Sequence, residues 1–306
     1  MNFIVLGAGA IGCYVGGRLA AHGQPVCLVG RPHALEPIAQ HGLKVTDLDG
    51  FDRTVPASAL QMAPTLADAA PGADSVILLC VKSGATESAA RELAAACAPG
   101  TPVISLQNGV DNVARIAALA PGLNVLAGMV PYNVVLRGAH VHRATAGHLQ
   151  LQRDAVTERI APLFNAAGLA TTLPPDIRAV QWGKLLLNLN NPVNALSDLP
   201  LRQELLDRDC RRVFAALQTE ALRVMARLRN WVVIEKGEVG VGQTGTAKLR
   251  LRLDLTQMPK TFQVSALSNK DWNLESEWAR WPFVNAEAAP VSSPEDEPAG
   301  EEEGQR

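Results

Sequence analysis

Residues 3–12 read Phe3-Ile4-Val5-Leu6-Gly7-Ala8-Gly9-Ala10-Ile11-Gly12, an apolar run that leads into three glycines with the spacing GxGxxG. The run predicts a strand over 3–6, and the next residues predict a helix over 12–22 that ends at Gly23. A glycine turn between a strand and a helix is the context in which this spacing binds a dinucleotide. The first glycine permits the tight turn, the second lets the backbone approach a pyrophosphate, and the third allows close helix–strand packing. The helix N-terminus offers N–H groups to the phosphates; the alternative is a glycine-rich turn without a ligand.

Length and composition describe a globular chain with a sizeable core. The 306 residues are 47% apolar and 19% charged, and the mean hydropathy of +0.06 excludes a wholly disordered chain. No apolar run reaches the roughly 18 residues that a membrane span requires. Glycines interrupt the first residues before a signal peptide could form. We therefore expect a cytoplasmic protein with no membrane partner.

The formal net charge of −2 combines two unlike parts. Residues 286–306 hold seven acidic residues and one arginine, a net charge of −6, which leaves +4 for the rest of the chain. Neither part is basic enough to indicate a nucleic-acid partner. The five cysteines are scattered without a CxxC pair, so we expect free thiols in a reducing compartment and no metal site.

Short apolar runs alternate with helical stretches over the first 125 or so residues, which favours βαβ units and a parallel, doubly wound sheet. The predicted strands of this part are 25–29, 75–81 and 102–106, with shorter ones near Val45, Val55 and Leu60. Helices are predicted at 86–97 and 155–167. Further strands at 124–130, 134–136 and 147–152 are expected to complete the sheet.

A second, helical region begins near Pro174-Pro175, with long helices predicted over 176–191 and 201–227. Near residue 229 the composition changes, because residues 1–229 hold 39 alanines and residues 230–285 hold three. The predicted domains are a dinucleotide-binding domain over 1–172, a helical substrate and dimerisation domain over 173–285 whose part 229–285 is atypical, and a disordered acidic tail over 286–306.

Three polar residues follow predicted strands. Arg31 comes just after the second strand, where a cofactor with a free ribose 2′-hydroxyl usually meets an acidic residue. A guanidinium there pairs with a 2′-phosphate, which favours NADP over NAD; the alternative is a solvated loop arginine. Lys82 and Asn108 follow the strands 75–81 and 102–106, and the ligand crevice of an open α/β sheet lies at the carboxyl ends of its strands. Either of the two alone would more often be an ordinary loop residue, but the expected placement of Gly7, Arg31, Lys82 and Asn108 at one edge makes that alternative weaker.

The predicted helix 176–191 carries a polar stripe. Lys184, Asn188 and Asn191 lie at offsets of 0, +4 and +7, which places them on one helix face. Leucines at 185, 186, 187 and 189 surround them. Desolvation lowers the pKa of a lysine, and a lysine whose pKa approaches neutrality can deliver a proton. The alternative is a surface helix with an ordinary lysine.

Together these pieces resemble the ketopantoate reductases (2-dehydropantoate 2-reductases). The resemblance covers about residues 1–228 and rests on IVLGAGAIGCYVGGRLAAHG at 4–23, VKS at 81–83, QNG at 107–109 and WGKLLLNLNNPVNALSDLPL at 182–201. It implies a Rossmann-type α/β domain followed by an all-helical domain, similar to the C-terminal domain of 6-phosphogluconate dehydrogenase and incomplete here. It also implies NADPH-dependent reduction of 2-dehydropantoate to (R)-pantoate, on the path to pantothenate and coenzyme A.

The resemblance assigns roles to residues that match the family's motifs. The residues that would hold the cofactor are Gly7, Ala8, Gly9, Ala10, Ile11 and Gly12 at the pyrophosphate, Arg31 at the 2′-phosphate, Lys82 and Asn108 at the nicotinamide side, and Val134 through its backbone. Lys184 matches the family's proton donor. The residues that would contact the substrate are Asn108, Lys184, Asn188 and Asn191.

The resemblance stops after residue 228, where the family's Arg-x-Thr-Glu-Ile-Asp…Asn-Gly motif is missing. Our hypothesis is that residues from about 229 onward arise from a frameshift, an altered exon-like end or a gene-model error. Two alternative functions stay open: a non-catalytic NADP-binding protein or remnant, and a reductase of another 2-oxo or 3-hydroxy acid. A homodimer is expected.

Overall fold

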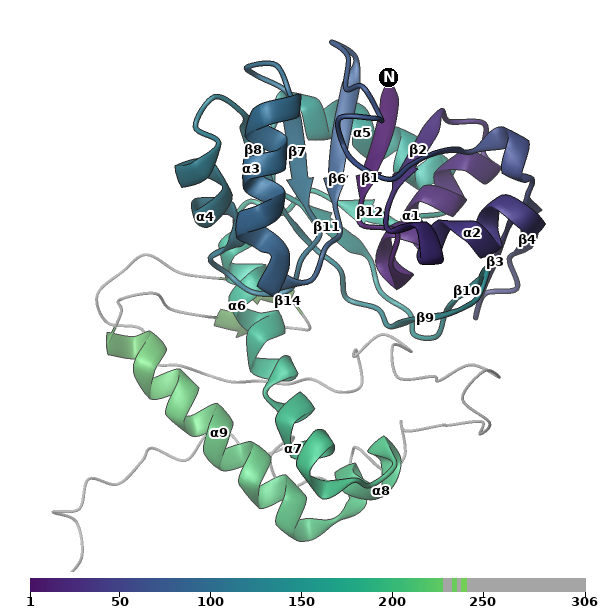
Figure 1. The fold of residues 1–306 in the computed structure, drawn as a ribbon. Coiled ribbons are helices and arrows are strands. Elements are labelled where there is room, and N and C mark those ends of the chain that lie inside the picture. Colours follow the sequence, from purple (N-terminus) through teal and green to yellow (C-terminus); the bar gives the residue numbers. More distant parts are fainter. Residues whose placement is uncertain (228–232, 236–237, 241–306) are drawn as a thin grey trace, which may run out of the picture.

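A computed structural model describes residues 1–227, 233–235 and 238–240. Its centre is an eight-stranded sheet (Figure 1). In spatial order the strands are β12 (Thr171–Thr172), β11 (Leu149–Leu151), β8 (Asn124–Met129), β7 (Pro102–Ser105), β6 (Ser75–Leu79), β1 (Asn2–Leu6), β2 (Val26–Val29) and β5 (Gln61–Ala63). The strands from β8 to β5 are parallel, whereas β11 is antiparallel to β8. The parallel sheet expected from the sequence is confirmed.

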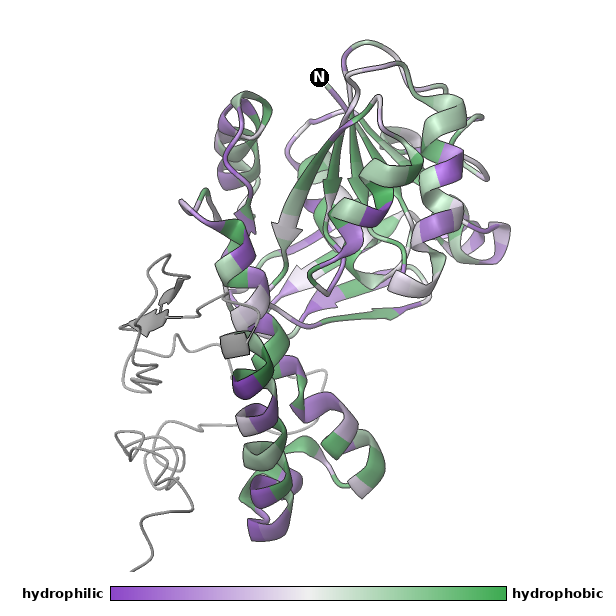
Figure 2. Cartoon of the chain, turned by 90° about the vertical axis from the view of Figure 1, so that its left-hand side faces the viewer, coloured by the Kyte–Doolittle hydropathy of each residue, from purple (hydrophilic) through white to green (hydrophobic). Residues whose placement is uncertain are grey.

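Helices cover both faces of this sheet. Phe3 and Val5 of β1 belong to the core that packs against α1 (Ala10–Ala21) and α5 (Ala155–Ala166). Ile4 and Leu6 point to the opposite face, against α3 (Thr86–Ala96) and α4 (Asn112–Leu119). A strand covered on both faces needs apolar residues throughout, and all five residues of β6 are buried. Figure 2 shows this apolar character along the central strands.

A second, four-stranded sheet packs over α1. Its strands in order are β4 (Asp52–Val55), β3 (Leu43–Asp47), β10 (His140–Arg143) and β9 (Val134–Arg137). The prediction that residues 134–136 complete the main sheet is wrong, because β9 pairs with β10, and β10 pairs in parallel with β3. α2 (Pro32–His41) occupies a stretch for which no helix was predicted.

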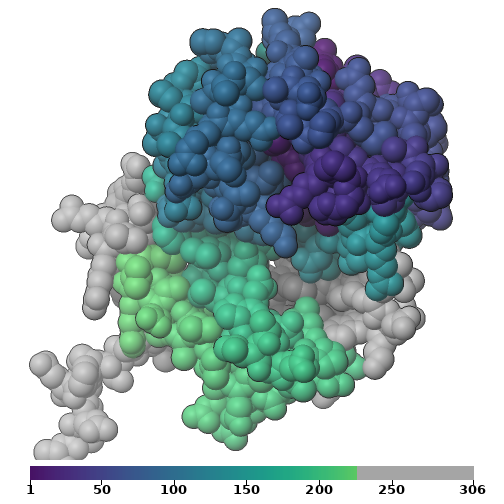
Figure 3. Space-filling view, viewed as in Figure 1, coloured from purple at the N-terminus to yellow at the C-terminus, as the bar shows by residue number. Residues whose placement is uncertain are grey.

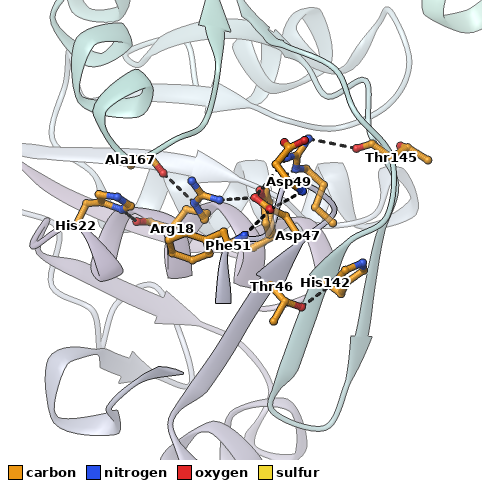
Figure 4. A network of polar contacts seen from close by, with 11 residues as sticks. Arg18, His22, Thr46, Asp47, Asp49, Phe51, His142, Thr145 and Ala167 are labelled. Carbon is orange, nitrogen blue, oxygen red and sulfur yellow. Dashed lines mark hydrogen bonds and ion pairs between the residues drawn. The ribbon is translucent and has the colours of Figure 1, made fainter. Parts of the chain in front are cut away.

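A buried polar network joins α1 to this second sheet (Figure 4). Arg18 of α1 forms an ion pair of 2.5 Å with Asp47 and donates its Nε–H to the carbonyl of Ala167 at 2.8 Å. Arg143 contacts the same carboxylate at 3.3 Å and also pairs with Asp49. Burial alone would raise the pKa of Asp47, but a backbone hydrogen bond and the two arginine charges outweigh it and hold this pKa below its usual value.

The remaining helices extend away from the main sheet (Figures 1 and 3). α6 (Ile177–Asn188) starts against the sheet, because Ile177 and Val180 pack with Ala127 and Met129 of β8. The chain continues through α7 (Asn190–Ser197), α8 (Leu201–Leu206), α9 (Arg208–Arg227) and a hairpin of β13 (Val233–Glu235) and β14 (Glu238–Gly240). Apart from this hairpin, the predicted atypical part 229–285 and the predicted tail 286–306 lie outside the described residues.

Two long helices expected from the sequence are each divided. Leu189 separates α6 from α7 within the predicted helix 176–191. Asp207 separates α8 from α9 within the predicted helix 201–227, and its extended backbone (ψ 131°) ends α8. Within the described part of the chain, no helix is long and apolar enough to cross a bilayer.

Candidate active site

The carboxyl ends of the parallel strands gather the predicted cofactor residues at one edge of the main sheet. β1 ends at Leu6 before the glycine turn, and β2 ends at Val29 before Arg31. β6 and β7 end shortly before Lys82 and Asn108. In Figure 1 this edge faces the start of α6. In open α/β sheets this edge is where ligands bind.

The glycine turn is closely packed at Gly7 and Gly12 and open at Gly9. Gly7 has φ +113°, and a Cβ there would lie 2.8 Å from the nitrogen of Val81. A Cβ on Gly12 would overlap the carbonyl oxygen of Gly7 and lie 2.8 Å from Val5 Cγ1. Gly9 differs, because nothing lies within 4 Å of a Cβ placed on it, so its surface is open to a ligand. No side chain caps α1, whose first N–H groups are therefore available to phosphate oxygens.

Arg31 follows strand β2 and Gly30, next to this glycine turn. A Cβ on Gly30 would lie 2.7 Å from Ala8 Cβ, so the end of β2 approaches the glycine turn closely. Arg31 follows at once and is the N-cap residue of α2, with an exposed side chain. A guanidinium at this position suits the 2′-phosphate of NADP.

The loops that carry Lys82 and Asn108 are joined by hydrogen bonds. Lys82 is exposed and precedes the short 3₁₀ helix η2 (Ser83–Ala85). The carbonyl of Asn108 accepts a hydrogen bond from Ser83 Oγ at 3.3 Å and one from Asn112 Nδ2 at 2.7 Å. The side chain of Asn108 is exposed. The structure therefore brings these two predicted residues together and leaves their side chains accessible.

Lys184 lies on α6, one turn beyond the residues that pack against β8. Its side chain is half-buried, and burial lowers the pKa of its ammonium. This is the direction expected from its apolar neighbours, because desolvation disfavours the charged form. A lysine with a lowered pKa is suited to proton transfer, and the helix that carries Lys184 starts at the end of β8.

The asparagines beyond Lys184 are placed differently from one another. Asn188 is the last residue of α6 and is half-buried. Asn191 lies in α7 after the break at Leu189 and is exposed, so the predicted stripe of three on one continuous helix is interrupted. Val134, predicted to meet the cofactor, is the half-buried first residue of β9 in the second sheet.

Comparison with known proteins assigns the chain to a family. Residues 3–155, half of the chain, match the family model described as ketopantoate reductase PanE/ApbA. The chain belongs to the ketopantoate reductase family. The 2-dehydropantoate 2-reductase of Halobacterium salinarum is 29% identical over 277 residues, which cover 85% of this chain and 88% of that protein. That of Pyrococcus horikoshii is 31% identical over 65% of each chain.

Solved structures of the family have the same fold. The ketopantoate reductase of Ralstonia eutropha superposes with a TM-score of 0.68 at 32% identity, covering 74% of this chain and 75% of that one. The 2-dehydropantoate 2-reductase of Geobacter metallireducens superposes with a TM-score of 0.65 at 27% identity. A D-mandelate dehydrogenase shares the fold at 20% identity.

The last part of the chain has a second likeness. Residues 204–282 match a family model described as a domain of unknown function, DUF4390. The match begins within α8, before the composition break near residue 229. The reductase of Halobacterium salinarum aligns over 85% of this chain, so the alignment to the reductases also extends into this segment.

Two groups of residues near the site were not predicted from the sequence. Gln107 is buried, and its Nε2 donates to the carbonyl of Val81 at 3.0 Å and to Thr86 Oγ1 at 2.9 Å, which ties the ends of β6 and β7 together. Asn190 is buried beside Glu204, to which it donates at 3.1 Å. Gln107 belongs to the triplet QNG at 107–109, but the neighbouring sequence does not show whether its amide is buried and bridges two strands or is exposed. Within the described residues, no cluster of three His, Cys, Asp or Glu side chains suits a metal ion.

Proposed function

We propose that this chain is an NADPH-dependent reductase that converts 2-dehydropantoate to (R)-pantoate. The observation that carries the proposal is Lys184, a half-buried lysine with a lowered pKa on the helix that starts at the ligand edge of the sheet. The open surface at Gly9, the uncapped α1 and the exposed Arg31 support NADPH as the cofactor. Membership of the family supports the substrate.

The residues would divide the work in the following way. The glycine turn and α1 hold the pyrophosphate, Arg31 holds the 2′-phosphate, and Lys82 and Asn108 line the nicotinamide side. The bound cofactor would supply a hydride to the C2 ketone of the substrate. Lys184 as an ammonium stabilises the negative charge that grows on the carbonyl oxygen and gives that oxygen its proton. Asn108 and Asn188 orient the ketone, and Asn191 and the backbone of Val134 add further contacts.

The proposal also covers the pathway, the cellular compartment and the oligomeric state. The reaction would supply pantoate for pantothenate and coenzyme A in the cytoplasm. We also expect a homodimer; the ketopantoate reductase of Staphylococcus aureus, which shares the fold, is described as dimeric. Light scattering on the purified full chain tests this part separately.

Two other functions compete with this one. Because residues 204–282 match a different family, the chain could bind NADP without completing a substrate site. Alternatively, the same machinery could reduce another 2-oxo acid. NADP binding without turnover of any oxo acid supports the first, and turnover of a different acid alone supports the second.

The deciding experiment follows NADPH consumption by the purified full chain. 2-Dehydropantoate is compared with pyruvate and 2-oxoisovalerate, and the Lys184→Ala variant is compared with Arg178→Ala. Arg178 is an exposed cation on the same helix, so its variant controls for loss of charge. Turnover of 2-dehydropantoate that Lys184→Ala alone abolishes supports the proposal. Turnover that survives Lys184→Ala refutes the assigned role of this lysine.

A further inference from the structure

A cavity of about 340 Å³ lies between α1, the second sheet and the turn after α5. Its volume lies in the range of small-molecule sites. Five separate segments line it, and the lining residues include Tyr14, Asp49, Tyr132, Arg143, His148 and Leu169. None of the residues assigned to the cofactor or the substrate is among them.

The polar part of this cavity wall includes the guanidinium of Arg143, the carboxylate of Asp49 and two tyrosines. Arg143 is buried, and its Nε–H donates to the hydroxyl of Tyr14 at 2.9 Å. Tyr132 is 5% exposed, and its hydroxyl has no hydrogen-bond partner within the part of the chain that is described. A buried hydroxyl without a partner is unfavourable unless a ligand or water completes it. Leucine and alanine side chains and the two tyrosine rings make the rest of the wall apolar.

Asp49 is the exposed member of the charge cluster at this wall. Its side chain is 66% exposed on the turn between β3 and β4, whereas those of Asp47 and Arg143 are 3% and 8% exposed. Because the Asp49 carboxylate faces solvent, a carboxylate from solution can compete with it for the guanidinium of Arg143. Without Asp49, the buried group of Arg18, Arg143 and Asp47 carries one net positive charge. His148 is exposed and, with Tyr14 and Tyr132, is a further titratable group that lines the cavity.

We propose that this cavity binds a small monocarboxylate with a short apolar body, whose carboxylate replaces that of Asp49 at the guanidinium of Arg143. One carboxylate matches the one uncompensated charge of the cluster. The hydroxyl of Tyr132 supplies a further donor, and Leu48 and Leu169 contact the apolar body. The proposal rests on this cavity alone and does not depend on the proposed reductase function.

The test uses benzoate as the probe and isothermal titration calorimetry on the full chain, at constant ionic strength and with saturating NADP⁺. Benzyl alcohol, a neutral molecule of similar shape, is the control ligand. The Asp49→Asn variant frees Arg143. Asp52→Asn is its matched control, because Asp52 lies on the same hairpin, is 63% exposed and pairs with Lys44 at 3.4 Å. Tyr132→Phe removes only the hydroxyl without a partner and preserves the packing.

The expected result is benzoate binding in preference to benzyl alcohol. Asp49→Asn should tighten benzoate binding by about two- to fivefold, since a competing exposed ion pair is lost. Asp52→Asn should leave it unchanged, and Tyr132→Phe should weaken it by about two- to tenfold. Absence of benzoate binding to both the native chain and Asp49→Asn would overturn the proposal. Equal effects of Asp49→Asn and Asp52→Asn, or competition between benzoate and the cofactor, would overturn it as well.

Discussion

Alanine substitutions at two glycines of the same turn should separate folding from cofactor binding. Gly12→Ala places a Cβ on the carbonyl oxygen of Gly7 and 2.8 Å from Val5 Cγ1. Gly9→Ala places a Cβ where nothing lies within 4 Å, on a backbone with φ −91° and ψ −170° that alanine adopts freely. The first change should therefore destabilise the protein, and the second should weaken NADPH binding.

The magnitudes follow from these contacts. Overpacking against a fixed backbone oxygen costs about 3 kcal/mol, at the upper end of the usual range. Alanine recovers about 1 kcal/mol through its higher helix propensity within α1. The net loss of about 2 kcal/mol for Gly12→Ala lowers Tm by about 4–8 °C. For Gly9→Ala, the change in stability stays within about 1 kcal/mol, but the new methyl group occupies the approach of the pyrophosphate, which should weaken NADPH binding by about tenfold or more.

Circular dichroism melting and NADPH titration by fluorescence, both on the full chain, measure the two effects separately. The native chain and the Gly23→Ala variant serve as controls, because Gly23 ends the same helix far from the turn and has open space at its Cβ. Gly23 has φ +77°, so its variant shows what a strained glycine position costs without a clash. A Gly12→Ala variant that melts like the native chain, or a Gly9→Ala variant that binds NADPH normally, would refute the reasoning.

Three further outcomes are expected. Lys184→Ala should lower kcat by about 10²- to 10⁴-fold. In the native chain kcat should fall as pH rises through the lowered pKa of Lys184, because the acid must be protonated; an Arg178→Ala variant should keep this pH profile. Arg31→Gln should reduce the preference for NADPH over NADH by about tenfold, measured as the ratio of kcat/KM values, and an unchanged ratio would exclude the 2′-phosphate contact. Asp47→Asn should destabilise the chain by about 3–5 kcal/mol, since it leaves two buried arginines without their shared carboxylate. The pKa of Asp47 is held below the ordinary value of an aspartate. Its stabilisation is therefore present above that ordinary pKa and is lost as pH falls through it toward the lower folded-state pKa; acid melts compared with those of the variant check this.

The main sheet was predictable because its strands carry strong local signals. Residues 3–6, 25–29 and 102–106 are short apolar runs next to glycine or proline, and each is a strand within one residue of its predicted ends. The second sheet was not predictable in this way. β10 reads His140-Val141-His142-Arg143, and its polar residues are buried through partners far away in sequence, such as Thr46 and Asp47.

In the helical region, the apolar periodicity of the sequence did not predict where one helix ends and the next begins. The apolar spacing of 176–191 continues across Leu189, whose backbone (φ −62°, ψ −15°) is itself nearly helical, so the break leaves no mark in the pattern. The position of Asn191 depends on that break. Lys184 was predictable as a candidate because it is a cation among leucines, and the lowered pKa follows from the same composition.

The contacts that hold α1 in place also set the shortest fragment of this chain that we expect to bind a cofactor. The match to the family model ends at residue 155, but Arg18 donates to the carbonyl of Ala167, and Ile160 and Phe164 of α5 fill the core beneath α1. A fragment cut at 155 would expose this apolar surface and remove that carbonyl. During synthesis, the helix after the glycine turn therefore gains its contact between Arg18 and Ala167 only when residues about 150 positions later have been made. A nascent chain should acquire nicotinamide-cofactor binding only after α5 has left the ribosome.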